Sequence, residues 1–195
     1  MKHFVVAIGR EFGSGGKQIG QILAESLGVK CYDEELVSLI EDKLKMHKYE
    51  ISNLDEKLRV NVPSYMDMGF NGESERVFEA QKEVIMEAAE KESCIFIGRC
   101  ADYILKDRDD LVSVFVYAPY GVRFSKLKKE YPGISDKGIK KMIEEMEYKR
   151  HNYHKYFTKQ NRASRDYRQI MVDSSLLGIE GTAKLLQQVI EAKFS

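Results

Sequence analysis

The chain has 195 residues, and its 31 Lys and Arg balance its 31 Asp and Glu. This length fits one compact domain, or one domain that carries a large insertion. With 43% apolar residues, the composition argues against a disordered chain. The apolar runs are far shorter than the roughly 20 residues of a membrane span, and the N-terminal run is too short for a signal peptide. Three cysteines without a CxxC spacing exclude a disulfide framework, so we expect a reducing, cytoplasmic setting.

The first thirty residues predict a strand, a glycine-rich turn, a helix and a second strand. Residues 3–9 form a continuous apolar run rich in Val and Ile, which is typical of a central strand in a parallel sheet. The glycines of 13–16 follow, and an amphipathic helix then runs until Gly28 stops it. Residues 29–32 predict a short second strand. The unit has the size of one right-handed crossover.

Residues 33–92 predict a helical insertion without a strand. Apolar spacing from Leu36 to Leu44 and from Val77 to Ala89 indicates two helices. The stretch between them is loop-like over residues 60–72. Its apolar side chains fit the core of the insertion or, alternatively, the lining of a base pocket; they are Tyr65, Met66, Met68 and Phe70.

The second half of the chain alternates helices with three further buried strands, at residues 94–98, 111–118 and 170–172. A basic helical segment runs from about residue 120 to Phe157, and we expect the polar residues 158–168 after it to be mobile. A closing helix spans residues 178–194. Its inward-facing side chains are expected to be Ile179, Leu186, Val189 and Ile190.

Five short strands alternating with helices predict an α/β domain with three layers around a parallel sheet. The two long helical segments, residues 33–92 and about 120–168, both leave from the carboxyl edge of that sheet, where ligands bind in open parallel sheets. We therefore expect a single domain over residues 1–195. Its core would consist of about residues 1–32, 93–119 and 169–195.

Zero net charge conceals two oppositely charged regions. Residues 33–93 hold 8 Lys and Arg against 16 Asp and Glu, whereas residues 120–170 hold 14 against 6. One interpretation is that these are two solvated helical faces of opposite charge, because charge patterning alone indicates effects on solubility and on the electrostatic attraction of ligands. The other is a basic segment that handles polyanionic substrates. Aromatic residues among the lysines of 148–157 could stack on RNA, but no nucleic-acid motif accompanies them, so we expect no nucleic-acid partner.

The segment Gly13-Ser14-Gly15-Gly16-Lys17 leads from a strand into a helix N-terminus, which is a phosphate-binding arrangement. Glycines let successive backbone N–H groups converge on phosphate oxygens, and the helix dipole adds about half a positive charge there. Lys17 would place a point charge on the outer phosphates. The dinucleotide fingerprint G-x-G-x-x-G fails because residue 18 is Gln, so a nicotinamide enzyme is the weaker interpretation.

The standard P-loop motif, G-x-x-x-x-G-K-[ST], is matched only in part. Gly16 and Lys17 agree with it, but Glu11 stands where the first glycine belongs. Gln18 replaces the hydroxyl that normally holds magnesium, so the sequence leaves the metal ligand unknown. Glu11 either anchors the loop through Arg10 or contacts the substrate.

The residues from Arg10 to Gly20, Arg-Glu-Phe-Gly-Ser-Gly-Gly-Lys-Gln-Ile-Gly, resemble the opening of the cytidylate kinase-like family, a branch of the P-loop nucleoside monophosphate kinases. Further segments agree with that family: Tyr32-Asp33-Glu34-Glu35-Leu36, Gly98-Arg99-Cys100-Ala101-Asp102, Tyr117-Ala118-Pro119, Lys149 to Thr158, and Asp173 to Gly178. The resemblance implies a three-layer P-loop kinase fold with a five-stranded parallel sheet, a helical substrate-binding insertion over 33–92 and a lid over 120–168. It also implies ATP-dependent phosphorylation of a nucleoside monophosphate such as CMP or dCMP, with Mg²⁺.

The residues and the resemblance together assign candidate roles. Lys17, Arg99 and Arg150 are the candidate catalytic residues, because phosphoryl transfer needs positive charge around the transferred group. The donor phosphates would contact the loop residues Gly13, Ser14, Gly15, Gly16, Lys17 and Gln18. Arg99 corresponds to the family arginine near the acceptor phosphate. The candidate acceptor contacts are Arg10, Asp33, Arg99, Lys149, Arg150 and Tyr153.

Several candidates have a structural alternative. Asp33 could cap the following helix, and Arg99 could pair with Asp102 or Asp107 on the surface. Lys149 and Arg150 could lie on a solvated helix face, although Arg suits a phosphate clamp and a closing lid would exclude water.

The remaining polar candidates are found in the lid region. His151 and His154 have a spacing that metal pairs use, but no third ligand is evident. Arg162 and Arg165 are further candidate lid arginines.

Three functions remain open at this stage. The sequence favours a kinase that moves the γ-phosphate of ATP to a small acceptor. The negative charge of the insertion, however, would repel a doubly charged monophosphate. The departures at Glu11 and Gln18 keep open a nucleotide-binding regulatory module without transfer activity. The third is a kinase of another small molecule. Small-molecule nucleotides are the expected partners, and the sequence does not indicate an oligomeric state.

Overall fold

The computed structural model describes residues 1–45 and 72–195. At its centre lies a five-stranded parallel sheet with the strand order β2-β3-β1-β4-β5. The strands are β1 (Val5–Arg10), β2 (Lys30–Tyr32), β3 (Cys94–Ile97), β4 (Leu111–Tyr117) and β5 (Ile170–Asp173). The predicted α/β class and its five parallel strands are therefore confirmed.

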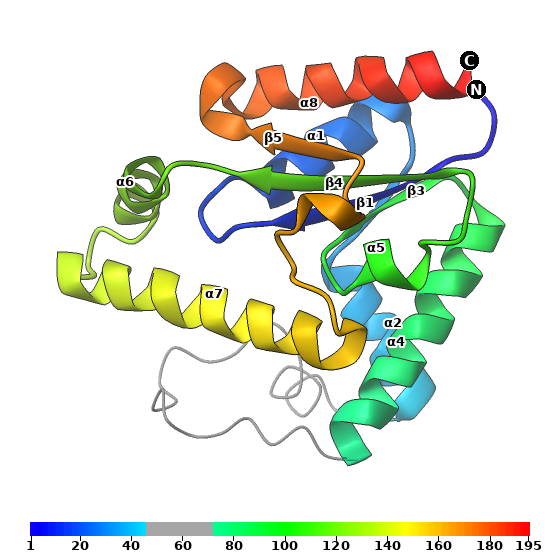
Figure 1. Ribbon diagram of the computed structural model, residues 1–195, viewed down its shortest axis with the longest axis horizontal. Helices are drawn as coiled ribbons and strands as arrows, with labels where there is room; N and C mark the ends of the chain where they lie inside the picture. Colours follow the sequence, from blue (N-terminus) through cyan, green and yellow to red (C-terminus); the bar gives the residue numbers. More distant parts are fainter. Residues whose placement is uncertain (46–71) are drawn as a thin grey trace.

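Helices cover both faces of the sheet (Figure 1). Along β1, Val6 and Ile8 join one apolar core while Val5 and Ala7 join the other, because successive strand side chains point to opposite faces. Two helices pack on the first face: α1 (Gly16–Leu27) and α8 (Ser174–Phe194). The other face is covered by α2 (Glu34–Leu44), α4 (Gly72–Lys91) and α5 (Ala101–Ile104). Each fully buried aliphatic side chain stabilises the fold by roughly 1.5–3 kcal/mol.

The strand order reverses at β1. From this strand the chain crosses past β3 to β2 on one side, whereas β4 and β5 lie on the other. Ligands of open parallel sheets bind beyond the carboxyl ends of the strands at such a point. The glycine-rich turn leaves β1 at this position, so the fold places it where a ligand site is expected.

The acidic insertion contains the two predicted helices, α2 and α4. Leu36 and Ile40 of α2 share one core with Val77 and Ile85 of α4, as their helical spacing indicates. The predicted insertion loop, with the following apolar residues, lies outside the described residues: Tyr65, Met66, Met68 and Phe70.

The basic segment after β4 differs from the sequence prediction. Instead of one helical stretch, it contains α6 (Tyr120–Glu130) and α7 (Asp136–Thr158). Pro132 and Gly133 fall in the gap, where proline lacks a backbone donor and glycine weakens helical geometry. Helix α7 begins after Ser135, which caps it by accepting a hydrogen bond from the Gly138 amide at 3.2 Å.

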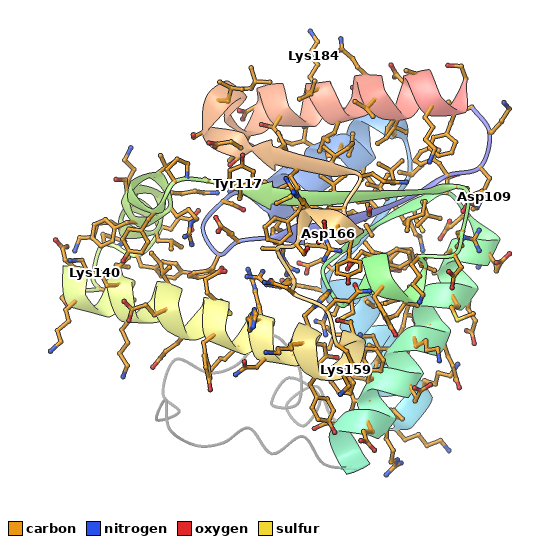
Figure 2. All side chains as sticks on the ribbon, viewed as in Figure 1. Asp109, Tyr117, Lys140, Lys159, Asp166 and Lys184 are labelled. Carbon is orange, nitrogen blue, oxygen red and sulfur yellow. The ribbon has the colours of Figure 1, made fainter. Side chains whose placement is uncertain are left out.

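The basic side chains of this region divide into an exposed and a buried set. Lys140 projects away from the body of the molecule on α7 (Figure 2) and is exposed, which fits a solvated face. Lys149, Arg162 and Arg168 are each only 8% exposed. The stretch 158–168 is polar as predicted, and its two buried arginines contact the interior, Arg162 at the Arg10 carbonyl and Arg168 at Asp102.

The closing helix α8 begins earlier than predicted. Asp173 caps it, since its carboxylate accepts a hydrogen bond from the Ser175 amide at 2.8 Å. Gly178 then adopts a φ of 70° and kinks the helix, so the predicted start at this residue marks the kink. Val189, expected inside, is 37% exposed. No helix within the described ranges has the length and apolar character needed to cross a membrane.

Candidate functional site

The glycine loop connects β1 to the N-terminus of α1. Gly13 and Gly15 adopt left-handed conformations with φ of 82° and 83°, which side-chain-bearing residues rarely tolerate. A Cβ at Gly16 would lie 2.5 Å from the Arg10 Cβ, so this position is also restricted to glycine. The N-cap residue Gly15 has no side chain to cover the first amides of α1. The positive end of the helix is therefore available to an anion.

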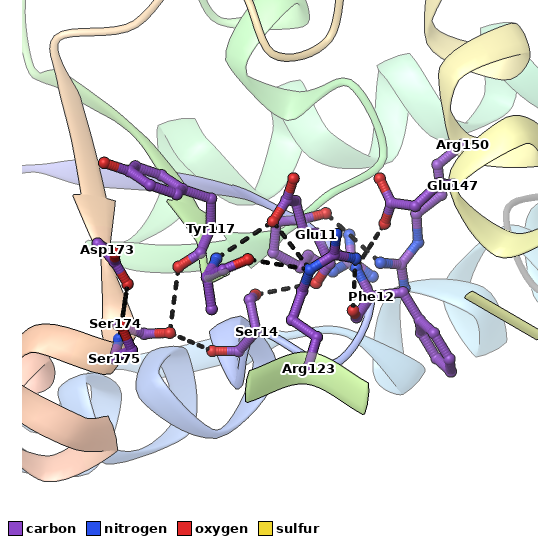
Figure 3. Close-up of polar contacts among 12 residues, drawn as sticks. Glu11, Phe12, Ser14, Tyr117, Arg123, Glu147, Arg150, Asp173, Ser174 and Ser175 are labelled. Atoms are coloured by element: carbon purple, nitrogen blue, oxygen red, sulfur yellow. Dashed lines mark hydrogen bonds and ion pairs between the residues drawn. The ribbon is translucent and has the colours of Figure 1, made fainter. Parts of the chain in front are cut away.

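Glu11 anchors this loop to the end of β4. Its Oε2 accepts a hydrogen bond from the Ala118 amide at 3.1 Å and lies 3.2 Å from Nε of Arg123 (Figure 3). Arg123, on α6, also donates to the carbonyl of Phe12 at 3.2 Å. The carboxylate that departs from the P-loop motif thus holds the loop in place. The anchor is Arg123, not the Arg10 suggested by the sequence.

Ser14 also contributes to the loop structure. Its hydroxyl donates to the carbonyl of Glu11 at 2.9 Å, and its own carbonyl accepts from the Ser174 hydroxyl at 2.6 Å. The Ser14 side chain is therefore directed into the fold (Figure 3), and it does not line the cleft described below.

Lys17 is held by two carboxylates at the start of α2. Its ammonium lies 2.8 Å from Asp33 Oδ2 and 3.0 Å from Glu34 Oε1. The hydrogen bond to Asp33 contributes most to raising the pKa of Lys17 above its usual value, so the ammonium stays charged at neutral pH. Asp33 occupies the N-cap position of α2, but its carboxylate makes no capping hydrogen bond. In this structure its side chain is a partner of Lys17 instead.

A cleft of about 570 Å³ opens beside the glycine loop. It brings together predicted site residues from distant parts of the sequence: Arg10, Gly13, Gly15, Gly16, Lys17, Gln18, Asp33, Arg99 and Arg150. Gln18 forms a hydrogen bond with Lys126 of α6, another residue of the lining. Three predicted residues, Ser14, Lys149 and Tyr153, do not belong to this lining.

Arg99 follows β3 in a strained turn. Gly98, Arg99 and Cys100 have φ values of 74°, 62° and 54°, and the last two carry side chains that disfavour the left-handed region. Arg99 is only 2% exposed. Burial lowers the pKa of its guanidinium to about 10, which leaves it charged at neutral pH. Asp102, suggested as its surface partner, pairs with Arg168 instead, at 2.6 Å.

Helix α7 is attached to the beginning of the glycine loop. Glu147 accepts a hydrogen bond from the Phe12 amide at 2.6 Å, and Arg150 donates to the Arg10 carbonyl at 3.4 Å (Figure 3). The Arg150 guanidinium also lies 5.6 Å from the centre of the Phe12 ring. Arg150 therefore forms part of the cleft wall.

Arg162 adds to the same attachment. It donates to the Arg10 carbonyl and pairs with Glu147, so α7 and the segment after it are tied to the loop together. Arg165, the other candidate lid arginine, has a 91% exposed side chain and does not line the cleft.

Lys149 and Tyr153 are buried elsewhere on α7. Burial lowers the pKa of Lys149, opposed by the charge of Glu145. Tyr153 packs against Phe78 and Phe157, and its hydroxyl donates to Gln81 at 3.3 Å.

His154 belongs to a buried polar cluster. Its Nε2 lies 3.6 Å from Asp102, and its Nδ1 is 3.0 Å from the Thr158 hydroxyl. Arg168 completes the cluster through its ion pair with Asp102. Across residues 1–45 and 72–195, no group of three or more His, Cys, Asp and Glu is arranged to hold a metal ion.

Sequence reasoning missed the residues that support the site. Gln81, Arg123 and Glu147 position the backbone around the cleft, but they belong to no motif. Helical periodicity places Gln81 on the inner face of α4, between apolar neighbours. A polar residue at a core position was the available signal, because buried polar groups are normally hydrogen-bonded.

Comparisons with known proteins agree with this fold and loop. A solved structure of an uncharacterised protein from Eubacterium ventriosum has a TM-score of 0.75 and 22% identity, over 97% of this chain and 99% of that one. Shikimate kinase from Acinetobacter baumannii, solved with shikimate, has a TM-score of 0.55 and 15% identity over 100% and 97% of the two chains. Shikimate kinase from Bacteroides thetaiotaomicron has a TM-score of 0.57 and 17% identity over 96% and 98%.

At these identities the structural likenesses show the fold alone, which is that of P-loop kinases. No curated protein sequence matches the chain significantly. The cytidylate kinase-like family matches residues 5–176, which include the glycine loop, Arg99 and helix α7. The chain belongs to the cytidylate kinase-like family.

Proposed function

We propose that this protein transfers the γ-phosphate of ATP to a nucleoside monophosphate such as CMP or dCMP. The observation that carries the proposal is the 570 Å³ cleft, in which an open helix N-terminus and the cations Lys17, Arg99 and Arg150 meet. Phosphoryl transfer requires mainly positioning and positive charge around the transferred group, and this combination supplies both.

The two ends of the cleft would have different tasks. The amides of Gly13 and of residues 15–18, together with the Lys17 ammonium, would bind the β- and γ-phosphates of ATP. Arg99 would bind the acceptor phosphate, and Arg150 would neutralise charge on the transferred group. Arg10 would also contact the acceptor. Ser14, Lys149 and Tyr153, which do not line the cleft, would act by supporting its walls.

Magnesium fits the carboxylates beside Lys17. Mg²⁺ is usually bound by one or two carboxylates together with substrate phosphates, and Asp33 and Glu34 lie at the loop where those phosphates would end. Once ATP attracts the Lys17 ammonium, these carboxylates would become available to the metal. The ion would supply neutralisation of the phosphate charge.

A kinase of another small molecule is the second candidate. The acidic pair at Asp33 and Glu34 and the net negative insertion favour an acceptor with less negative charge than a monophosphate. The solved shikimate kinases share the fold and phosphorylate, by name, a small hydroxy acid.

A nucleotide-binding module without transfer activity is the third. It is favoured by Gln18, whose amide takes the place of the motif hydroxyl and contacts Lys126. Nucleotide affinity that is insensitive to magnesium would support this alternative, whereas a strong magnesium dependence would count against it.

A coupled assay of ADP release tests the proposal. Purified protein with ATP and Mg²⁺ is tested against CMP, dCMP, the other nucleoside monophosphates and shikimate, with Lys17→Ala as the matched inactive control. The proposal predicts turnover on the order of 1–100 s⁻¹ with a cytidine monophosphate. Turnover of shikimate alone would establish the second candidate, and folded protein that turns over none of these acceptors would contradict the proposal.

The division into core, insertion and lid, the cytoplasmic location and the lack of a nucleic-acid or membrane partner stay predictions from the sequence.

A further inference from the structure

Gln81 bridges three elements around the acceptor side of the cleft. It lies on α4 and is fully buried, at 0% exposure. Its amide nitrogen donates to the Arg99 carbonyl at 2.8 Å, and its amide oxygen accepts from the Tyr153 hydroxyl at 3.3 Å. One amide therefore links the turn after β3 to helix α7.

The Arg99 turn has a particular need for such a contact. Gly98, Arg99 and Cys100 are consecutive left-handed residues, and two of them carry a Cβ that disfavours this conformation. Residues in sparsely populated conformations persist only where their surroundings hold them. Gln81 supplies a donor to the carbonyl in the middle of the run, so its hydrogen bond favours the turn that directs Arg99.

Packing alone does not explain why residue 81 is a glutamine, because burying its amide costs desolvation free energy. Val77, Val84 and Ile85 of the same helix belong to an apolar core, where an aliphatic side chain would avoid the desolvation of an amide. Gln81 satisfies both ends of its amide with two specific partners, as a buried polar network requires.

We propose that Gln81, oriented by Tyr153, is a positioning residue that holds the Arg99 turn for acceptor binding. The inference rests on the proposed function, in which Arg99 contacts the acceptor. Gln81 does not itself touch the substrate. Tyr153 lies on the same helix as Arg150 and Glu147, which contact the start of the glycine loop. The hydrogen bond between Tyr153 and Gln81 therefore also fixes the position of the Arg99 turn relative to α7.

Kinetics of Gln81→Leu and Tyr153→Phe test the proposal. Gln81→Leu removes this donor from the Arg99 carbonyl, so we expect the acceptor kcat/KM to fall about ten-fold, the effect of losing one buried hydrogen bond. The KM for ATP should change less than two-fold. Tyr153→Phe should give a smaller loss with the same pattern, and the double variant should lose less than the product of the two effects, because Tyr153 acts through Gln81.

Thr182→Val is the matched control. Thr182 is also fully buried and donates to a backbone carbonyl, that of Gly178 at 2.6 Å, but on α8. It should lower stability without changing the ratio of acceptor to donor kinetics. If Gln81→Leu lowers acceptor and ATP parameters equally, or leaves both unchanged, Gln81 is not a positioning residue for the acceptor.

Hydrogen exchange separates this inference from the proposed function. Gln81→Leu should speed amide exchange about ten-fold in the peptide covering residues 98–104 and leave the peptide covering 9–18 unchanged. Exchange does not require a substrate. A protein that phosphorylates nothing would overturn the proposed function, whereas unchanged exchange in residues 98–104 would overturn the role of Gln81.

Discussion

The two sides of the cleft are built in different ways. The proposed donor side is formed by backbone: Gly13 and Gly15 turn the chain, and the N-terminus of α1 presents its amides. The proposed acceptor side depends on the side chain of Arg99, which is buried and whose carbonyl accepts a hydrogen bond from Gln81 of α4. A backbone site requires a short local sequence, whereas a side-chain site requires partners that the fold brings from far along the chain.

This difference predicts how the two sides respond to substitution. Lys17 is 45% exposed and its partner Glu34 is 59% exposed, whereas Asp33 is only 9% exposed. Because the ammonium itself is half solvated, its removal should affect chemistry more than folding. The Arg99 turn leads directly into α5, where Asp102 belongs to a buried cluster with Arg168 and His154, so changes in this region should also reduce stability.

The largest effect is expected for Lys17→Ala. Loss of the ammonium should lower kcat/KM for ATP on the order of 1,000-fold, because a charge aimed at the developing phosphate charge is removed. The melting temperature should change by less than about 4 °C, since the Lys17 side of its ion pairs is 45% exposed and solvent screens it. Kinetics and thermal unfolding of the same preparation measure both. A large loss of stability with normal ATP kinetics would contradict this prediction, because it would show that Lys17 supports the fold and not the chemistry.

Asp102→Asn should give the largest stability effect. Arg168, whose side chain is 1% exposed, would lose its charged partner, so urea unfolding at pH 7 should show a loss of roughly 3 kcal/mol. Burial favours the protonated form of Asp102, but the hydrogen bond with His154 and the charge of Arg168 outweigh it and lower the pKa of the carboxyl.

A lowered pKa also sets the sign of the pH dependence. The stabilisation by Asp102 is fully present above the unfolded pKa and is lost as the pH falls through the folded value. The stability gap between wild type and Asp102→Asn should therefore stay nearly constant from pH 7 to about pH 5 and narrow as the pH falls below about 4. A gap that widened on acidification would contradict the assignment of the ion pair.

Arg99→Lys tests whether Arg99 acts on the acceptor and not on ATP. Lysine keeps the charge but cannot bind a phosphate through two parallel hydrogen bonds, so the acceptor kcat/KM should fall about 100-fold. ATP affinity, measured by calorimetry, should stay within two-fold of wild type. Equal losses of acceptor kcat/KM and of ATP affinity would mean that Arg99 serves both substrates and that the two sides of the cleft do not act independently.

The smallest effect is expected for Glu34→Gln. Its carboxylate is 59% exposed and lies 3.0 Å from Lys17, so removing its charge should release the ammonium slightly toward phosphate. We expect ATP without magnesium to bind about two- to three-fold more tightly, consistent with the modest strength of exposed pairs. Calorimetric titration in the presence of a chelator measures the change, and weaker binding would show that Glu34 does not compete with phosphate.

The same contrast explains what could be predicted from the sequence. The strand run before Gly13 and the helix ending at Gly28 follow from local periodicity and glycine chemistry, and both were predicted near their observed places. The break between α6 and α7 was missed although Pro132 and Gly133 marked it. Apolar spacing continues on both sides of this gap and concealed it.

Long-range partners could not be predicted in this way. The pairing of Glu11 with Arg123, and the contact of Gln81 with Arg99, join residues whose separation no local pattern encodes. The burial of Arg162 and Arg168 could not be predicted because a charged side chain in the sequence does not indicate its partner. Such contacts become visible only when the fold brings the elements together.

The most direct test of the central claim is a calorimetric comparison of ATP and AMP binding to the wild-type protein. If the loop amides and Lys17 hold the outer phosphates, AMP should bind on the order of 100-fold more weakly than ATP, and Lys17→Ala should remove most of that difference. Equal affinity for ATP and AMP, or a preference for ATP that survives in Lys17→Ala, would contradict the account.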